Sequence, residues 1–277
     1  MEAMDRIREL PFTGGLWKRT EEKKMKLEMG PKAFTVFRAY VGLLKAMSDE
    51  LTLRCDDNGI SVLGMDSSHV AMIDSKIKST FFEVYEAPEE GMITLNMLEL
   101  SKFLDRIDKD ENVKITHDAE QARLVIVTRK GGRNRRFKLP VLEPLDEEVP
   151  KPKIFYKSEG RILTQSVDSA IKDADLVSEH IKIAFRSDVL QLQAHGDMGD
   201  AENEYENGCD ELLELKSEED SVANFTLSYL KDMFGQLKNL SEVVTLYLST
   251  DMPLRIEVTP NDLNLEIDLY LAPMIGV

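Results

Sequence analysis

The chain has 277 residues, of which 42% are hydrophobic and 31% charged, and 51 acidic against 35 basic side chains give a formal net charge of -16. This length allows one large domain or two of ordinary size. The acidity excludes a surface that binds phosphate uniformly, so any contact with DNA needs basic residues gathered on one face. No apolar run approaches the ~18 residues of a membrane span, and residues 1–24 lack the apolar segment of a secretory signal. We therefore expect a cytosolic protein without membrane contact, which the two cysteines, Cys55 and Cys209, also fit.

In the first part of the chain, helical spacing of apolar residues near 33–47 precedes an alternating strand at 60–66. A second helix is predicted near 96–108, followed by strands at 113–116 and 122–128. The next stretch, RKGGRNRRFK (129–138), has six basic residues and no acidic one. Its Gly-Gly pair predicts a turn, so residues 133–139 are predicted to return as a strand.

Residues 141–152, VLEPLDEEVPKP, contain three prolines and four acids, which predicts an extended connector. Beyond it, helices are predicted near 162–176 and 227–238, and strands at 181–185, 190–193, 243–249, 254–258 and 265–272. The order of elements in 25–140 thus returns in 153–277. We predict an α+β fold of two similar domains with largely antiparallel sheets, preceded by a disordered extension at 1–24.

The predicted helices carry basic residues opposite their apolar stripes. Arg38, Gly42 and Lys45 follow the spacing i, i+4, i+7, and Lys231, Gly235 and Lys238 repeat it in the last helix. The second helix carries Lys102 and Arg106, and the third, more weakly, Lys172. An ordinary solvated face is the alternative for any one helix. Glycine on an exposed helix face costs ~1 kcal/mol relative to Ala, so these glycines indicate either close approach of another molecule or packing.

Two motifs, GISVLGMDSSHVAM (59–72) and DLYLAPMI (268–275), resemble those of the proliferating cell nuclear antigen family of sliding clamps, and GDMGDAE (196–202) resembles a turn of the same family. The resemblance covers about residues 25–277. It implies a DNA polymerase sliding clamp, or processivity factor, in which three two-domain subunits close head-to-tail into a pseudo-sixfold ring around double-stranded DNA. Helices would line the hole, and sheets would form the outside.

The resemblance also implies functional residues. Arg38, Lys45, Lys102 and Lys172 match basic positions that face the hole, and Arg106, Lys231 and Lys238 lie on equivalent faces by periodicity. Ser169 stands at a position that is often basic in the family, which weakens the DNA contact expected of the third helix. Contacts with phosphates alone would be independent of base sequence and sensitive to salt.

A second implied site is a docking groove for short hydrophobic and aromatic peptides of DNA polymerase, clamp loader, ligase and nucleases. Its expected residues are Met65, His69, Val70, Met72, Leu145, Val149, Pro253, Tyr270, Leu271, Ala272 and Pro273. Methionines suit such a site because the flexible thioether chain adapts to different partners. The alternative is that Met65, Val70 and Met72 are core residues at the end of a strand.

The basic stretch belongs to a third implied surface, the subunit interface. In the family the returning strand, here 133–139, is a sheet edge offered to the neighbouring subunit, and the matching edge falls near 198–206. The interface would join Arg133, Arg135 and Arg136 to Asp200, Glu202, Glu204 and Glu206. Opposite charges on two edges of one chain favour a head-to-tail contact between copies. DNA contact and a solvated hairpin are the alternatives, and the role of Arg129 and Lys130 stays open.

No catalytic constellation stands out, and we expect no metal and no cofactor. The four histidines and two cysteines show no ligand spacing, and no phosphate-binding glycine motif occurs. One subunit of a heterotrimeric or checkpoint-type clamp is the main alternative function, and an acidic hydrolase is a remote one. We expect the chain in the cytoplasm at the nucleoid, or in the nucleus of a eukaryote.

Overall fold

The computed structural model of the chain describes residues 24–144, 149–258 and 264–274. The predicted extension lies outside these residues except for Lys24. Among the residues described, no helix is long and apolar enough to cross a membrane.

Two halves of the chain repeat one order of elements. The first half contains helices α1 (Pro31–Met47) and α2 (Met97–Leu104), the short 3-10 helix η1 (Ser79–Phe81), and strands β1 (Lys26–Met29), β2 (Glu50–Asp56), β3 (Gly59–Met65), β4 (Ala71–Lys78), β5 (Val84–Glu86), β6 (Gly91–Asn96), β7 (Asn112–Asp118), β8 (Arg123–Lys130) and β9 (Arg133–Pro140). The second half contains helices α3 (Thr164–Ala174) and α4 (Leu227–Leu237) and strands β10 (Ser158–Leu163), β11 (His180–Phe185), β12 (Val189–Gly196), β13 (Gly199–Glu206), β14 (Leu212–Ser217), β15 (Ser221–Thr226), β16 (Val243–Leu248), β17 (Leu254–Val258) and β18 (Leu265–Leu271). Apart from η1, each element of the first half has a counterpart in the second. The predicted α+β class and its repeat are confirmed.

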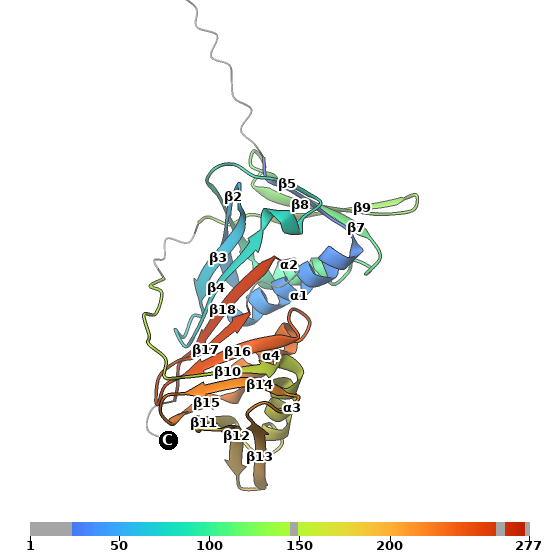
Figure 1. Ribbon diagram of the computed structural model, residues 1–277. Coiled ribbons are helices and arrows are strands. Elements are labelled where there is room, and N and C mark those ends of the chain that lie inside the picture. The colour runs from blue at the N-terminus through green and yellow to red at the C-terminus, as the bar shows by residue number, and fades with distance from the viewer. Residues whose placement is uncertain (1–23, 145–148, 259–263, 275–277) are drawn as a thin grey trace, which may run out of the picture.

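In the described residues the strands form three antiparallel sheets, with the orders β5-β1-β7-β8-β9, β14-β10-β16-β17-β18-β4-β3-β2-β6 and β13-β12-β11-β15. The nine-stranded sheet passes from one half to the other where β18 pairs with β4, from Leu265↔Ile77 to Leu271↔Ala71. Figure 1 shows this sheet running along the molecule, with helices on its right-hand side. The halves are therefore joined by a shared sheet as well as by the predicted connector.

The helices form where apolar spacing and end signals agree. Pro31 begins α1, since its fixed φ suits the first helical position, and Phe37, Val41 and Leu44, at the spacing i, i+4, i+7, are buried. Asn96 caps α2, because its side-chain oxygen accepts a hydrogen bond from the Glu99 amide at 2.9 Å. That helix ends at Leu104, earlier than predicted, so Arg106 lies in the turn that follows.

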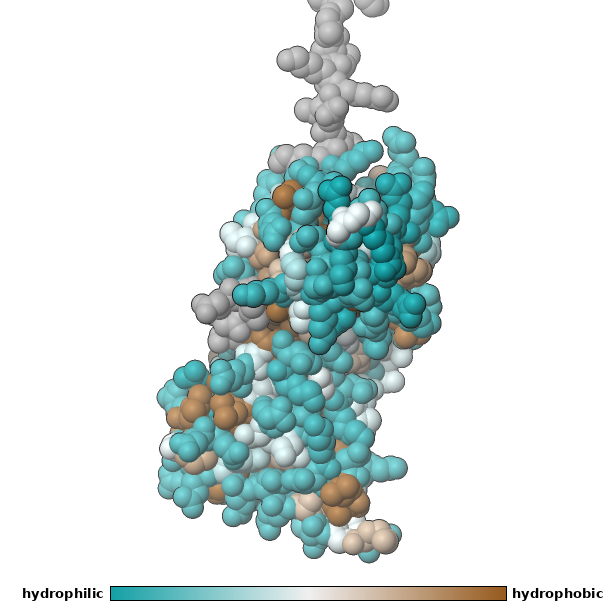
Figure 2. All heavy atoms as spheres, turned by 90° about the vertical axis from the view of Figure 1, so that its right-hand side faces the viewer, coloured by the Kyte–Doolittle hydropathy of each residue, from teal (hydrophilic) through white to brown (hydrophobic). Residues whose placement is uncertain are grey.

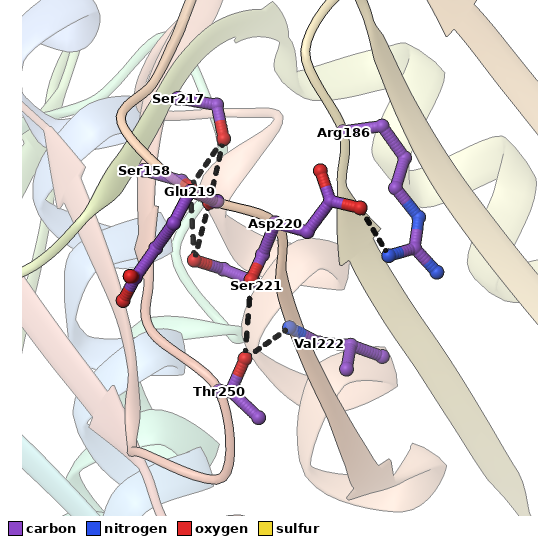
Figure 3. A network of polar contacts seen from close by, with 8 residues as sticks. All are labelled: Ser158, Arg186, Ser217, Glu219, Asp220, Ser221, Val222 and Thr250. Carbon is purple, nitrogen blue, oxygen red and sulfur yellow. Dashed lines mark hydrogen bonds and ion pairs between the residues drawn. The ribbon is translucent and has the colours of Figure 1, made fainter.

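A polar network joins two sheets of the second half (Figure 3). The hydroxyl of Ser158, at the start of β10, lies 2.9 Å from those of both Ser217 and Ser221, which begin and end the β14–β15 turn. Asp220 in that turn accepts a 2.8 Å bond from Arg186 after β11. Ser158 and Ser221 are buried, so their hydroxyls need these partners. The network holds β10 of the nine-stranded sheet against β15 of the four-stranded sheet.

Candidate functional site

The helices carry the predicted DNA-facing residues on the side turned away from the sheets. All seven lie on a helix or just after its last turn, and all are at least partly exposed: Arg38, Lys45, Lys102, Arg106, Lys172, Lys231 and Lys238. Figure 2 views the molecule from this side, and the surface is largely hydrophilic. The residues are therefore placed on one side of the molecule, and their contact with DNA stays a prediction.

The two glycines of the basic spacing have different surroundings. A Cβ atom at Gly42 would lie 2.6 Å from Oε1 of Gln236, so this glycine lets α4 pack closely on α1. At Gly235 nothing lies within 4 Å of such a Cβ. Packing of α4 on α1 therefore accounts for Gly42, whereas Gly235 leaves open space at the helix surface.

Four of these lysines are paired with acids of the same chain, three of them in the second half. Asp168 on α3 accepts hydrogen bonds from Lys172 at 2.6 Å and from Lys238 at 3.0 Å. Burial alone would raise the pKa of Asp168, but the two lysines lower it overall, so the carboxylate stays ionised. Lys231 binds Asp175 at 2.5 Å. These acids reduce the positive charge that the second half presents on the helix side.

The predicted interface strands are both terminal strands of their sheets, β9 in the five-stranded sheet and β13 in the four-stranded sheet. On β13 the predicted acids share one exposed face: Asp200, Glu202, Glu204 and Glu206. Glu202 and Glu204 accept hydrogen bonds from Gln193 and Gln191 of β12. The other face of β13 points to α3, where the Tyr205 hydroxyl donates to the Ser166 carbonyl at 3.1 Å.

On β9 the expectation for Arg135 is wrong in one respect, because this residue is not free to meet an external acid. Its guanidinium pairs with the buried carboxylate of Glu111 and donates to the Arg106 carbonyl at 2.8 Å. The side chains on the opposite face of β9 are Asn134, Arg136 and Lys138, all exposed. Arg136 and Lys138 therefore form the outward basic pair, while Arg133 at the strand start is also exposed.

A tight turn connects β3 to β4 and carries the quoted MDSSHV motif. Asp66 organises it, since its carboxylate accepts hydrogen bonds from the amides of Ser68, Val70 and Ala71 at 2.7–3.1 Å. The Tyr229 hydroxyl of α4 donates to the same carboxylate at 2.9 Å. Burial alone would raise the pKa of Asp66, yet these bonds lower it overall. Asp66 thus fixes the turn and ties it to the second half.

The predicted groove residues come together only in part. A surface hollow of about 720 Å³ is lined by Met65, His69 and Val149 together with the end of α1 and parts of β2 and β3. The tail lies beside the turn, since the Ala272 amide donates to the Val70 carbonyl at 2.8 Å. Partly exposed residues of the set outside this hollow are Val70, Pro253, Tyr270, Ala272 and Pro273. Leu145 lies outside the described residues.

Two groove expectations are wrong. Leu271 is 0% exposed, because it belongs to the buried face of β18 with Leu269 and Ile267. Met72 is 2% exposed, opposite Tyr270 in the β4–β18 ladder. Neither side chain offers surface to a peptide.

Comparisons with known proteins agree over most of the chain. The model of the N-terminal domain of proliferating cell nuclear antigen matches residues 26–148, and that of its C-terminal domain matches residues 152–274. A protein of Thermofilum pendens named DNA polymerase sliding clamp is 30% identical over 77% of this chain and 85% of its own. The chain belongs to the proliferating cell nuclear antigen family.

A second curated relative is similar in sequence, and two solved structures share the fold. One from Nitrosopumilus maritimus is 29% identical over 86% of this chain and 94% of its own. The solved proliferating cell nuclear antigen of Thermococcus kodakaraensis superimposes with a TM-score of 0.81 at 20% identity, covering 90% of this chain and 100% of its own. A structure described as the PCNA2-PCNA3 complex of Sulfolobus tokodaii gives 0.80 at 22% identity, covering 90% and 99%.

Three residues that bear on the surfaces of this sliding clamp were missed from the sequence. Lys138 could have been found, because it alternates with Arg136 and so shares its face. Asp168 stands four residues before Lys172, a helical pairing that is readable in sequence, although its contact with Lys238 is not. Tyr229 gave no signal, since its bond to Asp66 joins residues 163 positions apart.

Proposed function

We propose that copies of this chain close head-to-tail into a ring of three that encircles double-stranded DNA and acts as a non-catalytic processivity factor for a DNA polymerase. Membership of the sliding clamp family supports the general activity. The observation that supports a ring is the pairing of β18 with β4 within one chain. It supplies a pattern for two of the terminal strands of the sheets, β9 and β13.

The repeat makes β9 the counterpart of β18, and β13 the counterpart of β4. Within one chain β18 and β4 are hydrogen bonded, whereas β9 and β13 lie at opposite ends of the molecule (Figure 1). Because a strand edge exposes unsatisfied backbone groups, each needs a partner or protection. A second copy offers β13 to β9 in the arrangement that the chain already uses internally.

The internal register predicts which residues meet. We align the first residue of β9 with that of β18, and the first residue of β13 with that of β4. In this alignment Arg136 takes the place of Asp268 and Glu202 takes the place of Asp74, so the pair Asp268↔Asp74 corresponds to Arg136↔Glu202. The pair Tyr270↔Met72 becomes Lys138↔Asp200 in the same way. The outward basic pair of one copy thus faces outward acids of the next, which favours this register and disfavours pairing of like edges.

This complementarity favours identical copies over the heterotrimeric alternative. Both halves of the contact are present on one chain, so the contact is heterologous and closes into a ring if the rotation allows. A heterotrimer remains the second candidate because the similar structure from Sulfolobus tokodaii is described as a PCNA2-PCNA3 complex. A subunit of that kind needs a partner whose edge complements Arg136 and Lys138 better than its own β13 does.

DNA inside the ring would meet the basic residues of the helices, and enclosure would keep the ring on the duplex. The net charge of -16 discourages attachment of DNA elsewhere. Peptides of polymerase, clamp loader, ligase and nucleases would dock beside the Asp66 turn, where Met65, His69 and Val149 line the hollow. Such a protein works at the chromosome, in the cytoplasm of a cell without a nucleus or in the nucleus of a eukaryote.

Two measurements test the proposal. Light scattering of the isolated chain should give a mass near three times 31.5 kDa. After loading by a clamp loader, the protein should stay on a circular duplex through a gel-filtration column and leave when the duplex is cut. Monomers at micromolar concentration contradict the homotrimer, and equal retention on circular and cut DNA contradicts encirclement.

A further inference from the structure

On the side of the molecule where the helices lie, the two halves of the chain differ in how their basic residues are paired. In the second half, Lys172 and Lys238 share Asp168, and Lys231 binds Asp175. In the first half, Lys102 pairs with Glu99 at 2.8 Å. No acid of the described residues lies within ion-pair distance of the other cations there: Arg38, Lys45, Arg106 and Lys109.

Asp168 makes the pairing in the second half hard to exchange. Its side chain is only 4% exposed, and the two ammonium groups are its cationic partners, while the Gln165 amide donates to it at 3.5 Å. A phosphate that drew both lysines away would leave a buried carboxylate without a counter-charge, which is unfavourable. The exposed ion pair that each lysine would form with a phosphate contributes little free energy in return. We therefore expect Lys172 and Lys238 to stay bound to Asp168 instead of binding a DNA phosphate.

The first half instead has a basic hollow. It measures about 480 Å³ and lies between α1, α2 and the end of α4. Arg38, Lys45 and Lys109 line it, with Asp105 as the acid of the lining, so its charge is positive. Hydroxyl and amide groups complete the lining: Thr35, Ser101, Gln236 and Asn239. In Figure 2 the deepest teal, the colour of the most hydrophilic residues, gathers in the upper part of the molecule, which the first half forms.

We propose that this hollow is the phosphate-binding site of the clamp for the DNA backbone, and that the second half contributes little to DNA contact. The proposal rests on the encirclement proposed above. Arg and Lys with Ser, Thr, Asn and Gln are the side chains that contact phosphate and sugar in protein–DNA complexes. In a ring of three, the site recurs three times, separated by segments whose lysines are already paired.

The salt dependence of binding tests this inference, because each phosphate contact adds ~0.9 to the slope of log K against log salt. A fluorescent 30-base-pair duplex and fluorescence anisotropy supply the probe. Lys45→Ala and Lys109→Ala should each lower the slope by ~0.9. Lys231→Ala should lower it by less than half as much, and Lys153→Ala, an exposed lysine outside the helices, serves as the control for net charge.

Asp168→Asn gives the opposite prediction. It releases Lys172 and Lys238, so the slope should rise by up to ~1.8. Circular dichroism and light scattering establish whether each variant is folded and assembled, and if Asp168→Asn fails to fold, Asp175→Asn tests the release of Lys231 instead. Equal losses from Lys45→Ala and Lys231→Ala overturn the inference while leaving encirclement intact. A trimer without salt-dependent DNA binding contradicts the proposed function itself.

Discussion

Reversing Arg136 and Lys138 to glutamate tests the pairing of β9 with β13 of the next copy. In the register taken from β18 and β4, these residues face Glu202 and Asp200. The double variant Arg136→Glu, Lys138→Glu therefore places two like-charged pairs at each junction. We expect the ring to dissociate into monomers, because every junction is altered.

The size of the effect follows from cross-strand pairs. An opposite-charge pair contributes ~0.2–1 kcal/mol relative to Ala–Ala, and a like-charge pair is destabilising. Replacing attraction by repulsion at two positions thus costs ~1–4 kcal/mol per junction if the two effects are similar in size. At 1.4 kcal/mol for each factor of ten, the association constant of a junction falls by about one to three powers of ten.

Light scattering over a dilution series measures the change, at low salt where surface charges are least screened. Adding Asp200→Lys and Glu202→Lys to the double variant should restore much of the assembly, as a double-mutant cycle of true partners requires. Lys32→Glu with Lys153→Glu is the matched control, since both lysines are exposed and lie outside β9 and β13. The reasoning fails if the double variant stays trimeric at the concentrations where the control does.

Three further predictions concern stability. Met72→Ala and Leu271→Ala should each lower the free energy of unfolding by ~2–5 kcal/mol in urea titrations, because both side chains are buried; a loss below 0.5 kcal/mol would contradict that burial. Asp66→Asn should destabilise the protein by ~1–3 kcal/mol at pH 7. Folding lowers the pKa of Asp66, so its carboxylate stabilises the fold at a pH above its pKa in the unfolded chain. This stabilisation is lost as the pH falls through the pKa of Asp66 in the folded chain. The difference in stability between the variant and the unmodified chain should therefore shrink below pH ~4. Gly235→Ala should raise stability by ~0.5–1 kcal/mol in thermal melts, because its helical site has open space, and a loss would show that packing requires the glycine.

The sequence predicts the elements of this fold well where one periodicity dominates. The stripe of Phe37, Val41 and Leu44 identifies α1, and the alternation of Leu265, Ile267 and Leu269 identifies β18. The same alternation also places Leu271 on the buried face. The groove expectation followed the family resemblance at that position, and the period of two was the better guide.

The surfaces are less predictable, because they depend on contacts between distant residues. The residues next to Arg135 in the sequence do not indicate that it pairs with Glu111. Nor does the sequence around Lys238 indicate that this lysine shares the Asp168 carboxylate with Lys172. Charge counts along a strand or helix show where cations gather. Only the folded arrangement shows which cations remain available to a partner.

The ladder between β18 and β4 has a mechanical consequence. A ring of three copies would contain two kinds of seam, one inside each chain and one between neighbours. The inner seam is reinforced by the Tyr229 bond to Asp66 and the Ala272 bond to Val70, and both of its sides belong to one polypeptide. The ring should therefore open for a DNA duplex at the contact between chains, where salt weakens the ion pair between Arg136 and Glu202 of the next copy.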